Sequence, residues 1–273
     1  MDHVFPYYKV EENAQRSDWV VGRCSGPKHT LHTIMPSGFA SYARICHPGW
    51  SVDFSYPDIE KYWLAERAGW IDPETLTPVR WHDVAVANNR NPHRLMQWNT
   101  SCLSTPRELG RSGIDSPMDG EFSKEMVESL FEILVDQSGE NQEVLCGIWE
   151  GFNISDYRGV TAKFESYPGH QHYLLFNSTL SKVRDGWLAA LEYAYRHHGI
   201  EASGYIPSAL WPTTRDWYLA VPYNQQSSYL GGSADLVSRV FGVENLETYQ
   251  ALPGDNIFTD VTSKAFNRNP PSN

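Results

Sequence analysis

The stretch from DWYLAVP (216–222) to SSYLGG (227–232) restricts the fold more than any other part of the chain. The first segment alternates polar and apolar residues, so Trp217, Leu219 and Val221 would share one face of a half-buried strand. The second segment is also apolar, and a short polar turn separates the two. Two such segments joined by a short turn predict a pair of antiparallel strands. We therefore expect antiparallel pairing in this part of the chain.

Helical spacing of apolar residues predicts several helices in the rest of the chain. The strongest pattern begins at Ser123, a helix-capping residue, and another helix begins after Ser233. The residues expected to point inward from this last helix are Leu236, Val237, Val240 and Phe241. Further helices are expected at 57–70, 78–89 and 182–199. Further strands are expected at 38–46, 144–152 and 172–180.

Strands and helices are mixed along the chain without a regular βαβ repeat. This mixture is typical of the α+β class, and we expect a single α+β domain over residues 1–260 with a largely antiparallel sheet and packed helices. The stretch at 91–121 is turn-rich, and it is either a surface excursion or, near 100–120, the place where two lobes of this domain meet. The segment 261–273 is polar and rich in Asn and Pro, and we expect it to be a disordered tail.

Composition and charge narrow the classes of partner. The chain has 273 residues and a formal net charge of −11, without any run of Lys and Arg. This balance argues against binding to nucleic acid or to anionic membranes, and is compatible with a basic protein partner. No apolar stretch reaches the length of about 18 residues that a membrane span needs, and no signal-peptide pattern is visible. The four cysteines are widely spaced, so we expect a cytoplasmic protein with reduced thiols.

Four familiar catalytic motifs are absent from the sequence. They are the G-x-S-x-G nucleophile elbow, the G-x-x-x-x-G-K-[ST] phosphate loop, the G-x-G-x-x-G dinucleotide motif and H-E-x-x-H. Their absence excludes the hydrolases, NTPases, dehydrogenases and zinc proteases that are easiest to identify. We predict no cofactor, and whether the protein is an enzyme stays open.

The best candidate for a binding site lies in residues 208–237. A Gly-Gly-Ser turn that enters a helix presents backbone N–H groups, and an arginine and several aromatic residues precede it. Such a combination can bind a small anionic ligand, a carboxylate or a phosphate, between aromatic walls. The same residues could instead fill the core. The candidate ligand-binding residues are Trp211, Arg215, Trp217, Tyr229, Gly231, Gly232 and Ser233.

Two weaker candidates concern metal binding and acid–base chemistry. His170 and His172 are two residues apart, so on a strand both rings would point to one face and could hold a metal with a further ligand, either Glu165 or one of His29 and His32. Glu150 ends an apolar segment, where a raised pKa would suit a catalytic acid or base. A polar histidine pair beside a turn and a solvated strand end are the alternative interpretations.

Five short segments resemble a loose group of uncharacterised bacterial proteins. They are YARICHPGW, VRWHDVA, IWEGF, LWPTTRDWYLAV and SSYLGGSADLV, spread over residues 38–255. The matching residues are His47, Pro48, Trp50, Trp81, Val84, Ala85, Trp149, Glu150, Gly151, Trp211, Pro212, Arg215, Trp217, Tyr229, Gly231, Gly232 and Ser233. The resemblance implies a bacterial protein of the cytoplasm, and it implies neither an activity nor a catalytic residue.

Two functional hypotheses stay open at this point. The first is a non-catalytic protein- or ligand-binding protein, accessory or immunity-like, whose acidic and aromatic surface neutralises a basic partner. The second is a small-molecule enzyme, for example a metal-dependent hydrolase, that uses the aromatic pocket around Arg215. The missing motifs and the net charge of −11 favour the first hypothesis.

Overall fold

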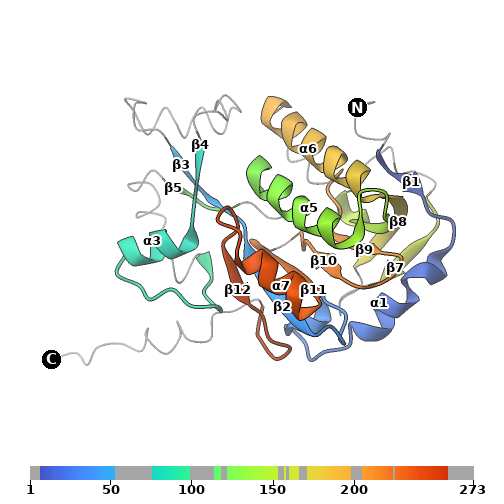
Figure 1. Cartoon of the computed structure of the whole chain (residues 1–273), viewed down its shortest axis with the longest axis horizontal. Coiled ribbons are helices and arrows are strands. Elements are labelled where there is room, and N and C mark those ends of the chain that lie inside the picture. The colour runs from blue at the N-terminus through green and yellow to red at the C-terminus, as the bar shows by residue number, and fades with distance from the viewer. Residues whose placement is uncertain are drawn as a thin grey trace.

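The computed structural model describes residues 7–52, 76–98, 114–117, 122–152, 157, 160–165, 171–197, 205–223 and 225–257. Within them, helices pack on a large sheet whose paired strands all run antiparallel (Figure 1). The predicted class, α+β with an antiparallel sheet, is therefore confirmed. The helices are α1 (Asp18–Arg23), α3 (Trp81–Ala87), α5 (Lys124–Ser138), α6 (Leu180–His197) and α7 (Ala234–Phe241).

The large sheet has the strand order β1-β8-β6-β9-β10-β11-β2-β12, and β7 also pairs with β8. Its strands are β1 (Lys9–Val10), β2 (Ser41–Cys46), β6 (Glu143–Trp149), β7 (Lys163–Glu165), β8 (His172–Thr179), β9 (Ala209–Pro212), β10 (Tyr218–Ala220), β11 (Ser227–Gly232) and β12 (Thr248–Gln250). A second, three-stranded sheet has the order β4-β3-β5. Its strands are β3 (Gly49–Val52), β4 (Leu76–Val79) and β5 (Ile114–Asp115).

The strand pair predicted from the sequence is formed by β10 and β11. Leu219 lies opposite Leu230, and Tyr218 lies opposite Gly231. Trp217, Leu219 and Val221 pack on the same side of the sheet, as their alternation predicts. The antiparallel pairing expected in this stretch is therefore confirmed.

The two faces of the large sheet carry separate cores. Helices α5, α6 and α7 cover one face, where Trp187 and Trp217 are fully buried (Figure 1). On the other face, Val20 of α1 and the 3₁₀ turn at Leu31–Thr33 pack against the sheet. Removing a large apolar side chain from water stabilises the fold by about 1.5–3 kcal/mol, so these two cores hold the layers together.

Serine side chains cap two of the helices. The Oγ of Ser123 accepts a hydrogen bond from the Met126 N–H at 3.2 Å, and that of Ser233 accepts one from the Leu236 N–H at 3.1 Å. Both predicted caps are confirmed. The prediction that Phe241 points inward is wrong, because its side chain is 41% exposed at the last residue of α7, where the apolar face of the helix has passed the sheet.

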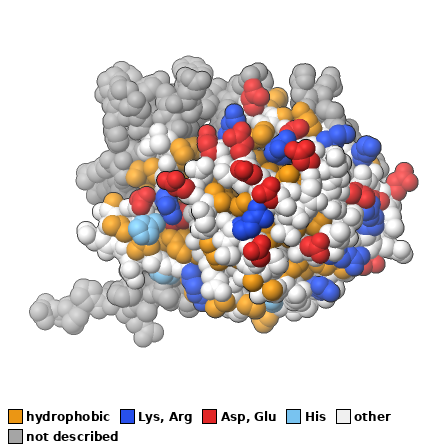
Figure 2. All heavy atoms as spheres, in the orientation of Figure 1, with side chains coloured by type: hydrophobic (Ala, Val, Ile, Leu, Met, Phe, Trp, Pro, Cys, Tyr) orange, Lys and Arg blue, Asp and Glu red, His pale blue; other side chains and the backbone are white. Residues whose placement is uncertain are grey.

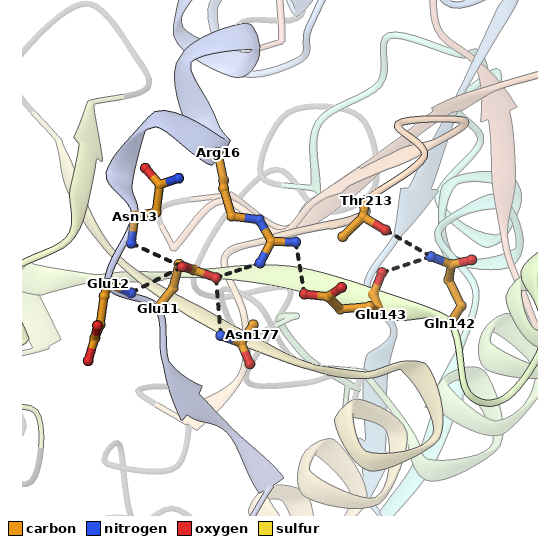
Figure 3. Close-up of polar contacts among 8 residues, drawn as sticks. All are labelled: Glu11, Glu12, Asn13, Arg16, Gln142, Glu143, Asn177 and Thr213. Carbon is orange, nitrogen blue, oxygen red and sulfur yellow. Dashed lines mark hydrogen bonds and ion pairs between the residues drawn. The ribbon is translucent and has the colours of Figure 1, made fainter.

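A polar network ties the N-terminal segment to the sheet (Figure 3). The carboxylate of Glu11 accepts hydrogen bonds from the N–H groups of Glu12 and Asn13, from the Arg16 guanidinium and from the Asn177 amide. Arg16 also donates to Glu143 on β6. Every oxygen of this buried carboxylate is thus used to hold β1 against the edge of the sheet.

Some predicted features lie outside the described residues. These are the helix at 57–70, the tail at 261–273, and His170. Among the helices that the structure describes, none is both long enough and apolar enough to cross a lipid bilayer.

Candidate functional site

The two tryptophans of the predicted binding site lie on opposite faces of the sheet. Trp211 packs with Tyr218 and Trp19 on the α1 side. Trp217 packs under α5, and its indole N–H donates to the Ser138 hydroxyl at 2.8 Å. Both side chains are fully buried, so they do not form the two walls of one pocket.

Arg215 lies in the turn between β9 and β10 and is exposed. Its φ of 64° places it in the left-handed region, which is uncommon for a residue with a side chain. The guanidinium carbon is 5.6 Å from the centre of the Trp19 ring, a cation–π contact. This contact gives Arg215 a structural role at the outside of the α1 layer.

The glycine turn at the end of β11 is closely packed. A Cβ on Gly231 would lie 2.6 Å from Phe39, and one on Gly232 would lie 2.8 Å from Leu236. Tyr229 is buried on the α1 side, where burial raises the pKa of its hydroxyl to about 12. Both glycines therefore admit neighbouring side chains, and those side chains fill the space in front of the turn.

Glu150 and His172 are both at the solvent side of the sheet. Glu150 follows β6 in a 3₁₀ turn, is half-exposed, and pairs with Lys163. His172 is exposed at the start of β8, opposite Glu165 on β7. No group of three His, Cys, Asp or Glu side chains within the described ranges is arranged to hold a metal ion.

A cavity of about 640 Å³ lies between the two sheets, where β2 ends. Five chain segments line it: the end of β2 and the turn after it, β3, the link from β4 to α3, the first turn of α5, and the link from α7 to β12. Small-molecule pockets in proteins commonly have volumes of about 300–1,000 Å³, a range that includes this cavity. We refer to it as the inter-sheet cavity.

Apolar side chains form much of the wall of the inter-sheet cavity. They come from both sheets and from α5: Pro48, Trp50, Pro78, Val79 and Met126. An indole face and a methionine side chain provide a flat and adaptable surface for an apolar ligand.

Glu247 is a buried carboxylate in the wall of the cavity. It accepts hydrogen bonds from the Trp81 N–H, from the His82 N–H at 2.8 Å and from the Tyr249 hydroxyl at 2.8 Å. Burial and the neighbouring Glu247 charge raise the pKa of Tyr249 well above its ordinary value, so this hydroxyl keeps its proton. Glu247 thereby holds the start of α3 against β12, and its oxygens are already occupied.

Cys46 is the only thiol that lines the inter-sheet cavity among the described residues. Burial raises the pKa of this thiol to about 12 and outweighs the opposing charge of Arg44. The thiolate is the nucleophilic form of cysteine, and at neutral pH it is almost absent here. Cys46 is therefore a neutral, weakly polar part of the wall.

A histidine and a serine lie in contact behind the cavity wall. The Nε2 of His47 is 2.8 Å from the Ser228 Oγ, the spacing at which a histidine can activate a serine nucleophile. Both side chains are completely buried, so no substrate reaches the hydroxyl in this structure. The pair joins β2 to β11 and has the geometry of a structural contact.

Charged groups of both signs line the mouth of the cavity. Arg80 has no hydrogen bond or ion pair with any residue that the structure describes, and the same holds for Glu125 and Glu244. Lys124 lies 3.8 Å from Glu128 on its own helix. One guanidinium and two carboxylates are thus available to a ligand.

The sequence did not identify this cavity as a site, although the quoted motifs touch it. HPGW contributes Pro48 and Trp50, and VRWHDVA contributes Arg80 and Trp81 at its edge. Glu247 and Glu244 have no motif around them. Only the pairing of β2 with β12 brings these segments together.

Similarity to known proteins is a further source of information about function. No model of a known protein family matches this chain. No curated protein and no solved structure is significantly similar to it.

Proposed function

We propose that this is a non-catalytic binding protein whose ligand is a small molecule held in the inter-sheet cavity. The observation that carries the proposal is the cavity itself, about 640 Å³ with apolar walls and uncommitted charges at its mouth. A concave pocket with an apolar wall and a few charged groups is the usual form of a small-molecule site.

The chemistry of the cavity wall favours binding over catalysis. A catalytic acid or base needs a free oxygen near the substrate, and the oxygens of Glu247 already accept three hydrogen bonds. A cysteine nucleophile reacts as its thiolate, and burial raises the pKa of Cys46 to about 12. Ser228 is completely buried behind the wall. None of these groups is prepared for bond breaking.

The surface gives less support to a basic protein partner. The net charge is −11, but acidic and basic side chains are interspersed over the face seen in Figure 2. The large apolar side chains that are exposed among the described residues belong to separate elements: Val10, Val21, Val86, Phe241 and Leu252. A protein-binding surface usually has a contiguous apolar patch, so the cavity is the better candidate.

A blocking variant tests the proposal. Val79 lines the cavity on β4, and Val79→Trp would place an indole in part of the space that a ligand occupies. Fragments of a small-molecule library that bind the wild-type protein in ligand-observed NMR should bind this variant at least about tenfold more weakly, a loss of 1.4 kcal/mol or more.

The control is Thr77→Trp, two residues earlier on the same strand. Thr77 is exposed and does not line the cavity, so this variant should retain the fragments. A library without any hit, or hits that bind Val79→Trp as well as the wild type, would contradict the proposal.

A further inference from the structure

We infer that the ligand of the inter-sheet cavity is a small zwitterion with an apolar body, such as a free apolar amino acid or a dipeptide, which places its anionic group at Arg80 and its cationic group at Glu244. This inference rests on the proposed function. The inference follows from the charged side chains that line the cavity. Some of them already have a partner, and others have no ion pair with any described residue.

Arg80 differs from the other arginines that the structure describes. Four arginines pair with carboxylates: Arg16, Arg94, Arg184 and Arg239. Arg23 and Arg215 lie against the Trp19 ring, Arg44 donates to backbone carbonyls, and Arg90 also has an interaction partner. Arg80 lines the cavity, and no described residue binds its guanidinium. A guanidinium in this position suits the two oxygens of a carboxylate.

The carboxylates of the cavity divide into committed and uncommitted groups. Glu247 already accepts hydrogen bonds from the first residues of α3 and from Tyr249. Glu244, in the link from α7 to β12, and Glu125, in the first turn of α5, are exposed and make no ion pair with any described residue. A ligand ammonium group can therefore find a carboxylate on the side of the cavity that α5 and α7 form.

A ligand with charge of one sign would meet an opposing group. A purely anionic ligand would bind Arg80 but lie near Glu125 and Glu244, whereas a purely cationic one would lie near Arg80. Like charges a few Å apart repel each other, more strongly where water is excluded. A ligand with one positive and one negative group can place each group beside an opposite charge, and it avoids both repulsions.

The apolar wall next to these charges sets the body of the ligand. Trp50 of β3, Val79 of β4 and Met126 of α5 line the same cavity as Arg80 and Glu125, and Val79 and Met126 are their neighbours in sequence. An apolar or aromatic side group would remove these side chains from water. The combination of one carboxylate, one ammonium and one apolar side group is that of an apolar amino acid.

Four probes with one body test the charge requirement by isothermal titration calorimetry on the full chain. They are phenylalanine, which is a zwitterion, phenylalaninamide, a cation, N-acetylphenylalanine, an anion, and the neutral N-acetylphenylalaninamide. Phenylalanine should bind about tenfold or more tightly than each of the other three, because each lacks a charge-assisted contact. The dipeptide Phe-Phe is a fifth probe, and tight binding of this peptide alone would support the class and assign a longer ligand.

Substitution of two exposed residues, Arg80 and Glu244, tests the two contacts one at a time. In Arg80→Gln, phenylalanine should lose its advantage over phenylalaninamide, and in Glu244→Gln it should lose its advantage over N-acetylphenylalanine. Lys182→Gln is the control, since Lys182 is exposed on α6 and does not line the cavity. The control should leave the order of the probes unchanged.

Failure of this inference is distinguishable from failure of the proposed function. Equal binding of neutral N-acetylphenylalaninamide and phenylalanine, both abolished by Val79→Trp, would overturn the inference and leave the small-molecule site in place. Absence of binding by all five probes would also overturn it, and the fragment screen would then decide the proposed function separately.

Discussion

Two buried carboxylates, Glu11 and Glu247, lie towards opposite edges of the large sheet and have similar exposure, 7% and 5%. Glu11 is joined to a guanidinium and to an amide (Figure 3), and it does not line the inter-sheet cavity. Glu247 binds two backbone N–H groups and a phenol, and it lines a cavity. Complete hydrogen bonding is thus common to both. The two carboxylates therefore differ not in their hydrogen bonding but in what lies beside them, because only Glu247 borders the inter-sheet cavity.

The strongest test of this comparison removes each carboxylate. Glu11→Ala and Glu247→Ala should each lower the free energy of unfolding by about 3 kcal/mol, because each removes a charged acceptor of at least three hydrogen bonds. Urea unfolding measures the loss, and Glu12→Ala, at an exposed residue, should have little effect. Only Glu247→Ala should also weaken the binding of cavity fragments. Equal weakening by Glu11→Ala would remove the distinction between the two groups.

Acid tests the polar network around Glu11. Burial alone would raise the pKa of Glu11, but hydrogen bonds from Asn13, Arg16 and Asn177 outweigh it and lower the pKa below the ordinary 4.5. A lowered pKa stabilises the fold at every pH above the unfolded value, and the stabilisation is lost as the pH falls through the folded value. The stability advantage of the wild type over Glu11→Gln should therefore be constant above pH 4.5 and shrink below it. Urea unfolding at a series of pH values measures this advantage, and an advantage that does not change with pH would show that Glu11 is not the titrating group.

Gln225 offers a contrast to both carboxylates, because its buried amide has no partner among the described residues. Gln225→Met keeps the size of the side chain and removes the unsatisfied polar atoms. It should raise the free energy of unfolding by about 1–2 kcal/mol. Its neighbour Gln226 donates to the Pro117 carbonyl at 2.8 Å, so Gln226→Met should lower stability. A loss of stability in Gln225→Met would show that this amide has a partner in solution.

The smallest expected effect concerns an exposed charge, Arg215. Both Arg215→Ala and Arg215→Gly lose the contact with Trp19, which is worth about 0.5–1 kcal/mol at an exposed position. The φ of 64° favours glycine, so Arg215→Gly should be more stable than Arg215→Ala by about 1 kcal/mol. Thermal unfolding of the three proteins measures the difference. Neither variant should change fragment binding, and a change would return Arg215 to the candidate site.

The parts of the fold that depend on local sequence were predicted well. The caps at Ser123 and Ser233 and the alternation of Trp217, Leu219 and Val221 each depend on a few neighbouring residues. The strand pair β10–β11 needed only the short turn between its strands. The prediction that Phe241 points inward was wrong, because periodicity alone does not say where a helix leaves the surface that buries it.

The candidate site could not be predicted in the same way, because it depends on long-range pairing. Cys46 and Glu247 are 201 positions apart and meet only where β12 joins β2. Conversely, Trp211 and Trp217 are close in sequence, and the pleat and the turn between them place their rings on opposite faces. Residue type identified the aromatic side chains correctly, but only the three-dimensional arrangement shows which of them border an open space.

The position of β2 between β11 and β12 has a consequence for biosynthesis. β2 ends at Cys46 and β12 begins at Thr248, so about 200 residues are made before both neighbours of β2 exist. At about 5–20 residues per second, a ribosome needs some tens of seconds for this stretch. During that time both edges of a largely apolar strand are exposed on the nascent chain, which is the form that chaperones bind and that aggregates. Expression at low temperature with extra holdase should therefore raise the soluble yield of this protein.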